Sequence, residues 1–223
     1  RRHRQPSCRA SARPRDPRQL AKLIGEGHGA HALILGEGVT SRDTRRNARK
    51  RKNELAALKR QVQCANRALG IKEVFVRNFP DNRFDSVPLL DLVKAVEEIK
   101  NSIRPEMIFT HFEGDLNVDH QMVFNAVLTA TRPMANESVK EIYSFEIPSS
   151  TDWRYPLAFS PDVFFDITST IKLKLAALSQ YKSEMREFPH PRSLESIELI
   201  ARYWGSKVGG GFIEAFKTIR VLR

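Results

Sequence analysis

The chain has 223 residues, of which 41% are hydrophobic, and it carries a formal net charge of +11. This length and hydrophobic content suit one globular domain with a sizeable core, and since no stretch approaches about 18 consecutive apolar residues, no membrane span is expected. The charge alone would indicate nucleic acid or an acidic membrane surface as a partner, but residues 1–19 contribute six of the eleven charges, so we expect no nucleic-acid partner.

Residues 1–19 differ from the rest of the chain because arginine and proline dominate them. They contain no apolar run of strand length and no hydrophobic segment of a secretory signal, which favours a cytoplasmic protein. We expect this segment to be unpacked and favour an aberrant start caused by truncation or a frameshift. A basic nucleic-acid-binding arm and a disordered extension without function are the alternatives.

Apolar runs and helical patterns alternate from residue 31 onward. A buried strand over residues 31–35 ends at the glycine-containing turn 36–38, and a long amphipathic helix is predicted over residues 41–69. The cations between Arg42 and Arg60 lie at helical spacing, which is typical of a solvated helix face. Further along, the pattern predicts strands over 71–79, 106–111 and 141–147, and helices over 87–103 and 119–130.

The last third departs from simple alternation. A short strand over residues 163–167 precedes helices over 171–184 and 194–206, and periodicity does not decide whether 212–222 is a strand or a helix. The polar stretch 148–161 is predicted to be a loop over the active-site edge. Residues 20–223 are therefore expected to form a single α/β domain, a Rossmann-like, doubly wound and mostly parallel sheet with helices on both faces.

The segment from Asp115 to His120 is the most informative for function because it joins a predicted strand to a predicted helix. Open α/β sheets place their ligands at such points. An adjacent Asp119–His120 pair suits metal binding, because a neutral imidazole ligates a metal through one nitrogen while nearby carboxylates fix the ring. The competing interpretation is a helix N-cap by Asn117 or Asp119, which requires no metal.

Three segments together resemble one family: Thr110 to His120, Phe79 to Asp85, and Pro189 to Glu195. In their order and spacing, the chain resembles the PIG-L/LmbE-like zinc-dependent N-acetylglucosamine deacetylases over about residues 20 to 223. In that family an α/β domain holds one Zn²⁺ through a His and an Asp of an N-terminal His-Pro-Asp-Asp-Glu motif and through a His of a later Asp-His pair. The later pair resembles Asp119–His120, so the resemblance implies His120 as a zinc ligand.

The chain departs from the family pattern at two places. The His-Pro-Asp-Asp-Glu motif does not occur in it, so two zinc ligands and the family's general base are absent from the chain as given. Many members also carry a His three residues before the ligand, where this chain has Asn117. The resemblance thus implies an incomplete zinc site, with Asp119 orienting a neighbouring group and Asn117 donating to the developing oxyanion.

Substrate binding is predicted at Arg83, His190 and Arg192. Arg83 lies among polar residues that can hydrogen-bond sugar hydroxyls, although an exposed Arg beside an Asx turn gives the same pattern. His190 and Arg192 precede a helix capped by Ser193, and a proline-shaped loop before a capped helix is the alternative. His111 is expected to be a structural histidine at a strand end.

The resemblance implies a metal-dependent hydrolase that removes acetyl from an N-acetylated amino sugar or its conjugate, impaired in this chain by the missing ligands. The implied partner is a small-molecule amino sugar, and the sequence is compatible with a homo-oligomer. A non-catalytic sugar or nucleotide binder on the same fold and a basic-arm nucleic-acid binder remain the alternatives.

Overall fold

The computed structural model describes residue 24 and residues 27–223. The predictions for residues 1–19, and the domain boundary predicted at residue 20, fall outside the described residues. The elements and contacts below refer to the described part of the chain.

The first sheet has two parallel strands, β1 (His31–Gly36) and β2 (Glu73–Phe79). Helix α2 (Lys52–Ala68) connects them, and Gly70 follows it with a φ of 77°, in the left-handed region that glycine adopts without steric cost. This is the strand–helix–strand unit that the alternating pattern predicted.

The second sheet has four strands in the order β3-β4-β6-β5. Strands β3 (Met107–His111) and β4 (Glu141–Phe145) are parallel, with Thr110 opposite Ser144. Strands β5 (Val163–Asp166) and β6 (Ile213–Val221) join antiparallel, so residues 213–221 form a strand and not a helix. The predicted parallel pairing therefore holds for the first four strands, and the last two run antiparallel.

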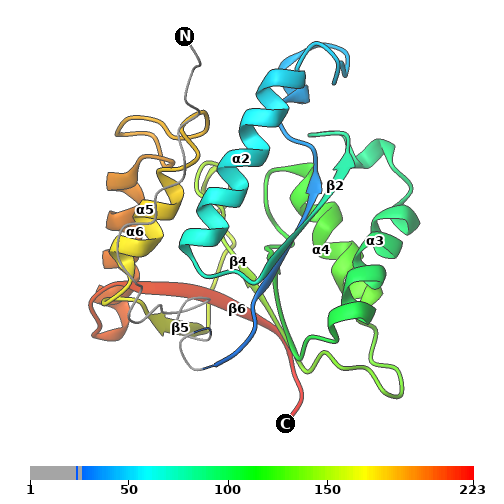
Figure 1. Cartoon of the computed structure of the whole chain (residues 1–223). Helices are drawn as coiled ribbons and strands as arrows, with labels where there is room; N and C mark the ends of the chain where they lie inside the picture. Colours follow the sequence, from blue (N-terminus) through cyan, green and yellow to red (C-terminus); the bar gives the residue numbers. More distant parts are fainter. Residues whose placement is uncertain (1–23, 25–26) are drawn as a thin grey trace.

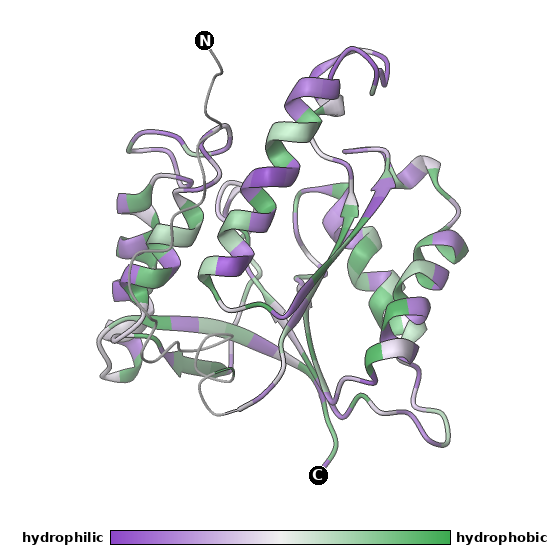
Figure 2. Cartoon of the chain, viewed as in Figure 1, coloured by the Kyte–Doolittle hydropathy of each residue, from purple (hydrophilic) through white to green (hydrophobic). Residues whose placement is uncertain are grey.

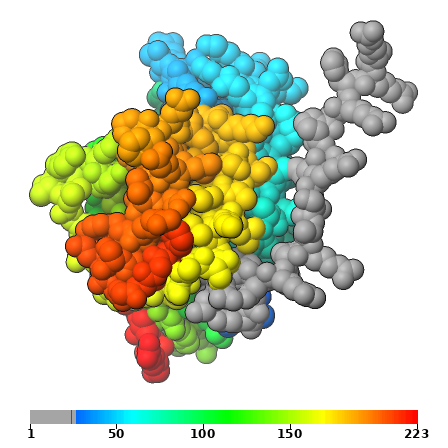
Figure 3. Space-filling view, turned by 90° about the vertical axis from the view of Figure 1, so that its left-hand side faces the viewer, coloured from blue at the N-terminus to red at the C-terminus, as the bar shows by residue number. Residues whose placement is uncertain are grey.

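Helices cover both sides of the strands (Figure 1). Helices α3 (Leu89–Ile103) and α4 (Val118–Ala130) pack together on one side. On the other side, α2 packs against α5 (Ile171–Leu178), which in turn packs against α6 (Leu194–Val208). Figure 3 shows this second face, where the yellow and orange C-terminal part of the chain lies beside the cyan residues of α2. The α/β architecture with helices on both faces is confirmed.

The largest described core cluster lies between the strands and the α3–α4 layer. Leu92 and Ala126 are fully buried there, and Leu33 of β1 and Ile108 of β3 pack against the same cluster. Burying a leucine side chain contributes about 2 kcal/mol, so this cluster is a main source of stability. Figure 2 shows the corresponding pattern, with apolar residues concentrated on the strands and on helix surfaces that face them.

The predicted helix over residues 41–69 begins only at Lys52, which corrects the sequence prediction. After the short 3-10 helix η1 (Thr40–Arg42), residues 43–51 form a loop in which charged side chains pair with one another. Asp43 accepts hydrogen bonds from Lys50 at 2.7 Å and from Arg51 at 2.8 Å, and Arg46 donates to Glu37 at 2.7 Å. The cations at 42–51 therefore belong to a loop beyond β1 and not to a solvated helix face.

The C-terminal helices also differ from the prediction at their ends. Helix α5 ends at Leu178, six residues before the predicted end at Glu184, and residues 179–193 contain only turns and irregular structure. Helix α6 begins where the sequence predicted, because the Ser193 side chain accepts a hydrogen bond from the Ser196 backbone N–H. None of the described helices is long and apolar enough to cross a membrane.

A largely buried ion pair joins α3 to the loop after α4. Lys100 donates to Glu137 and to the Ala130 carbonyl oxygen, and the two charged side chains are 13% and 10% exposed. Burial is the largest single effect and disfavours the Glu137 carboxylate, but the hydrogen bond and charge of Lys100, together with backbone hydrogen bonds from Val139 and Ser138, outweigh burial and lower the pKa of Glu137. The pair therefore stabilises the fold above the carboxyl's unfolded pKa of about 4.3, and this contribution is lost as the pH falls below that value.

Replacing Glu137 by Gln is expected to lower the free energy of unfolding by about 3 kcal/mol at pH 7, since Lys100 then keeps a buried charge without a carboxylate. The difference from the unsubstituted chain should shrink at pH 3, because protonation of Glu137 removes the same carboxylate that the substitution removes. Urea unfolding at both pH values measures the effect. A difference that stays constant with pH would contradict the lowered pKa.

Candidate functional site

The loops after β1, β2, β3 and β4 converge at one edge of the molecule. Ser41, beyond β1, donates to the Asp81 carboxylate beyond β2, and the Asn117 amide, beyond β3, donates to the Asn82 side-chain oxygen at 3.0 Å. Ser150 and Thr151, beyond β4, donate to Asp115. The 81–85 loop and the segment that contains His120 thus lie together, as the carboxyl ends of parallel strands do.

Asn117 forms the start of α4, as the helix-cap interpretation required. Its side-chain oxygen accepts a hydrogen bond from the Asp119 backbone N–H at 2.8 Å, and its amide nitrogen faces Asn82. Such a cap typically contributes about 1 kcal/mol to helix stability. Asn117 therefore has a structural role, and its predicted role as an oxyanion donor stays a prediction.

Asp115 is the most heavily bonded carboxylate of the site and is completely buried. It accepts hydrogen bonds from Ser150, from Thr151 and from the Asn117 backbone N–H at 2.8 Å. Burial disfavours its ionisation, but these bonds and the one to His120 outweigh burial and lower the pKa of Asp115 to about 2. Asp115 is therefore a carboxylate at neutral pH.

His120 is oriented by Asp115, whose carboxylate oxygen lies 3.0 Å from the His120 Nδ1 atom. A carboxylate at Nδ1 fixes the tautomer that carries a proton there and leaves Nε2 with a lone pair for a ligand or a proton. The residue that orients the His120 ring is therefore Asp115, five positions earlier in the chain.

Asp119 holds the 81–85 loop. One of its carboxylate oxygens accepts from the Asn82 backbone N–H at 2.6 Å and the other from the Phe84 backbone N–H at 2.9 Å. Burial raises the pKa of Asp119, and these two backbone hydrogen bonds oppose the rise in part. Asp119 thus orients a neighbouring loop, and a direct catalytic role for it remains a prediction.

His111 lies directly behind His120. The two imidazole rings are stacked, with centroids 4.2 Å apart and an interplanar angle of 11°. Burial, assisted by the neighbouring His120, lowers the pKa of His111 to about 3, so the ring is neutral at physiological pH. Its buried Nδ1 atom has no hydrogen-bond partner within the described residues.

The predicted substrate-binding residues lie in two loops of the same edge. Arg83 donates to the Thr44 carbonyl oxygen at 3.0 Å, which attaches it to the loop beyond β1. Arg192 donates to Ser149 at 2.6 Å and thereby joins the loop that holds Asp115. The His190 ring packs edge-on against Trp153, with centroids 5.5 Å apart, and its Nδ1 atom accepts from the Arg192 backbone N–H.

Backbone strain marks the same loops. Asn82 and Ser149 have φ angles of 52° and 67°, which are unusual for residues other than glycine. Each is fixed by neighbours of the site: Asn82 by Asn117 and Asp119, and Ser149 by Arg192. Strained residues held by their surroundings cluster at functional sites, which supports the assignment of this edge.

The zinc ion that the resemblance implies can be compared with the donors present here. Within the described residues, no group of three or more His, Cys, Asp or Glu side chains is arranged to hold a metal ion. Both oxygens of Asp115 and both of Asp119 are already engaged in hydrogen bonds, which leaves His120 Nε2 as the available donor of the predicted motif. These residues do not fit a catalytic zinc site, which needs three protein ligands.

The sequence alone did not identify several residues of the site. Asp115, the partner of His120, was not predicted as such. Its position five residues before His120, at the start of the same loop, is compatible with this contact. The polar run Ser149 to Thr151 lies within the loop predicted over the active-site edge, but its contact with Asp115 depends on tertiary structure. Ser41, which donates to Asp81, carried no local signal.

Comparisons with known proteins agree with this geometry. A family model described as GlcNAc-PI de-N-acetylase (PIG-L) matches residues 18–131. A Bacillus cereus protein named probable N-acetyl-alpha-D-glucosaminyl L-malate deacetylase 2 is 26% identical over 127 residues. That match covers 56% of this chain and 56% of the relative, so it spans little more than half the length of either.

Solved structures share the fold at low sequence identity. The N,N'-diacetylchitobiose deacetylase from Pyrococcus horikoshii has a TM-score of 0.69 and 18% identity, covering 90% of this chain and 76% of that one. GalB, the 4-carboxy-2-hydroxymuconate hydratase from Pseudomonas putida KT2440, has a TM-score of 0.66 and 19% identity, covering 92% and 90%. Because a deacetylase and a hydratase share this fold, the fold alone does not select the reaction.

Proposed function

The chain belongs to the PIG-L family of de-N-acetylases, and from this premise we propose that it is a hydrolase that removes acetyl from an N-acetylated amino sugar or its conjugate. The family match carries this proposal. It covers residues 18–131 and so includes the whole segment from Asp115 to His120, where four loops meet. The deacetylase named among the relatives is consistent with the same reaction class.

The residues of the site divide between orientation and substrate binding. Asp115 keeps the His120 Nε2 atom directed to a fixed position, and Asp119 keeps the 81–85 loop closed against α4. Arg83 and Arg192, from opposite loops, can donate hydrogen bonds to sugar hydroxyls. His190 supports the Arg192 backbone, so it positions this arginine.

Zinc dependence is part of the proposal, although the metal-binding side chains among the described residues do not by themselves form a zinc site. In this proposal His120 is one ligand, and the ligands and the base that the family motif supplies are missing from the chain as given. The chain should therefore hold the metal weakly and turn over substrate slowly, since one imidazole does not replace three protein ligands.

A non-catalytic sugar binder on the same fold is the second candidate. The observation that favours it is that the described residues contain no group of three metal-binding side chains, while the polar residues that could contact a sugar are in place. This candidate predicts binding of N-acetyl sugars without acetate release.

Acetate release from a panel of N-acetylated sugars tests the proposed function. We expect slow hydrolysis of N-acetylglucosamine derivatives that increases with added Zn²⁺. Calorimetric binding of the same sugars provides the comparison. Sugar binding without any acetate release at saturating Zn²⁺ would favour the non-catalytic candidate.

A further inference from the structure

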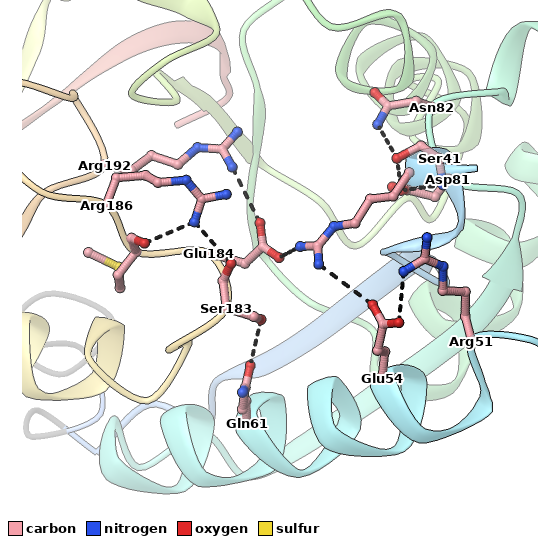
Figure 4. A network of polar contacts seen from close by, with 12 residues as sticks. Ser41, Arg51, Glu54, Gln61, Asp81, Asn82, Ser183, Glu184, Arg186 and Arg192 are labelled. Atoms are coloured by element: carbon pink, nitrogen blue, oxygen red, sulfur yellow. Dashed lines mark hydrogen bonds and ion pairs between the residues drawn. The ribbon is translucent and has the colours of Figure 1, made fainter. Parts of the chain in front are cut away.

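A series of polar contacts, joined in places by residues adjacent in the chain, begins and ends at His120, and we call it the polar ring. From His120 it passes through Asp115 to the 149–151 loop, and from there through Arg192 to Glu184. Glu184 pairs with Arg42, and the neighbouring Ser41 bonds to Asp81. Asn82, next to Asp81, bonds to Asn117 and to Asp119, which precedes His120. Figure 4 shows one segment of it, with Arg192 and Glu184 across from Ser41, Asp81 and Asn82.

Glu184 closes this ring by bridging two arginines. Its Oε1 atom lies 2.6 Å from Arg42 Nη2, and its Oε2 atom lies 3.4 Å from Arg192 Nη1. Each carboxylate oxygen thus serves a different guanidinium group. All three side chains are about one-third exposed, so a ligand can reach them from solvent.

The two arginines are placed to hold an anion other than Glu184. Arg192 is independently fixed by Ser149, and Arg42 has a second, longer contact to Glu54 at 3.7 Å. Glu184 itself lies between α5 and α6 in a turn, where its backbone N–H donates to the Tyr181 carbonyl oxygen at 2.8 Å and its side chain is held by the two arginines. An incoming carboxylate or phosphate offers the same pair of oxygens and can take its place with charge-assisted hydrogen bonds.

The surrounding charge favours the approach of an anion. The loop that carries Arg42 also carries the exposed Arg45 and Arg49, for which no acidic partner is present among the described residues. A rim of unneutralised cations raises the local concentration of anionic ligands and speeds their association.

We propose that Arg42 and Arg192 form an anion subsite that binds a carboxylate or phosphate group carried by the amino-sugar substrate, and that Glu184 occupies it in the absence of substrate. The inference rests on the proposed function, because it assigns the substrate of that site to the anionic conjugates. It differs from a purely structural clasp in one measurable respect. A clasp would support neutral and anionic sugars equally, whereas an anion subsite discriminates between them.

Calorimetric titration of the full chain with three sugars tests the subsite. The probes are N-acetylglucosamine 1-phosphate, N-acetylmuramic acid as the carboxylate form, and neutral methyl N-acetylglucosaminide. Glu184→Gln should strengthen binding of at least one anionic sugar about threefold to fivefold, the range for a partly exposed charge contact, because the competing carboxylate is removed. Arg42→Met and Arg192→Met should each weaken the same sugar by a similar factor.

Matched variants serve as controls. Glu187→Gln removes an exposed glutamate three residues away, and Arg202→Met removes an exposed arginine of α6 that lies outside the polar ring. Neither should alter the affinity ratio of anionic to neutral sugar by more than about twofold. Which anionic sugar responds distinguishes phosphate from carboxylate. The proposal is overturned if Glu184→Gln changes all three affinities in parallel, or if no sugar binds more tightly to this variant.

These titrations measure binding and not turnover, so the two proposals can fail separately. Discrimination without acetate release would retain the anion subsite and reject the deacetylase. Acetate release with no discrimination between anionic and neutral sugars would retain the deacetylase and reject the subsite.

Discussion

Replacing Asp115 by alanine is expected to lower the free energy of unfolding by about 3 to 4 kcal/mol. The buried carboxylate accepts from two hydroxyl groups, one backbone N–H and the His120 ring, and its removal leaves these donors without an acceptor. Each buried donor left unpaired costs about 1 to 3 kcal/mol, moderated by relaxation and entry of water. Urea unfolding at pH 7 measures the change.

Two further variants define the cause of this loss. Asp115→Asn keeps one acceptor oxygen and should lose less stability than the alanine variant. Asp85→Ala removes an exposed aspartate from the neighbouring loop and should change stability by no more than about 0.5 kcal/mol. If the Asp115 and Asp85 variants proved equally stable, Asp115 would not be the organising residue of the site.

Restoring the family motif is expected to raise activity by about two orders of magnitude or more. The change places an apolar strand followed by His-Pro-Asp-Asp-Glu before residue 20, in place of residues 1–19. In the proposed zinc site this motif would add two ligands to His120, and a catalytic zinc site needs three. Zinc content after dialysis and acetate release from N-acetylglucosamine derivatives are the two measurements.

His120→Ala in the restored protein should then remove both zinc retention and turnover, while His28→Ala, in an exposed turn before β1, should leave both unchanged. Asp115→Asn in the same background should weaken zinc binding about 10-fold to 100-fold, because residues that orient a ligand carry effects of that size. If the chain as given matched the restored form in turnover, the ligand assignment would be wrong, and His111 and Asp115 would be the next candidates.

The elements of this fold were predictable where apolar periodicity was strong. Strands β1 to β4 and helices α3, α4 and α6 agree with their predicted ranges to within two residues at most ends, because each buries a continuous apolar face. Residues 43–51 were not predictable in this way. Their cations lie at helical spacing, but pairing with Asp43 and Glu37 gives them partners that a local pattern does not contain.

The candidate site was predictable in position more than in detail. The order of strand, polar loop and helix located His120 at the sheet edge, and Asn117 was recognised as a candidate cap. The partner of His120 could not be chosen from the sequence, because Asp115 and Asp119 lie on the same short segment and differ only in what surrounds them once the chain is folded. The bridge from Glu184 to Arg42 spans 142 positions, and no sequence pattern encodes such a contact.

Because the strands form two separate sheets, the polar ring connects two groups of strands. Among the described residues no backbone ladder connects the β1–β2 pair to the four-stranded sheet, and the two halves share the side-chain core beneath α3 and α4. At the carboxyl edge the ring connects the two sheets at two places. Asp119 bonds to the 81–85 loop, which follows β2, and Glu184 bonds to Arg42, which follows β1. Side-chain packing permits small sliding movements that strand hydrogen bonds resist. An anion that displaces Glu184 would therefore also remove one of these two contacts, so that ligand binding and relative movement of the two groups of strands would depend on the same ion pair.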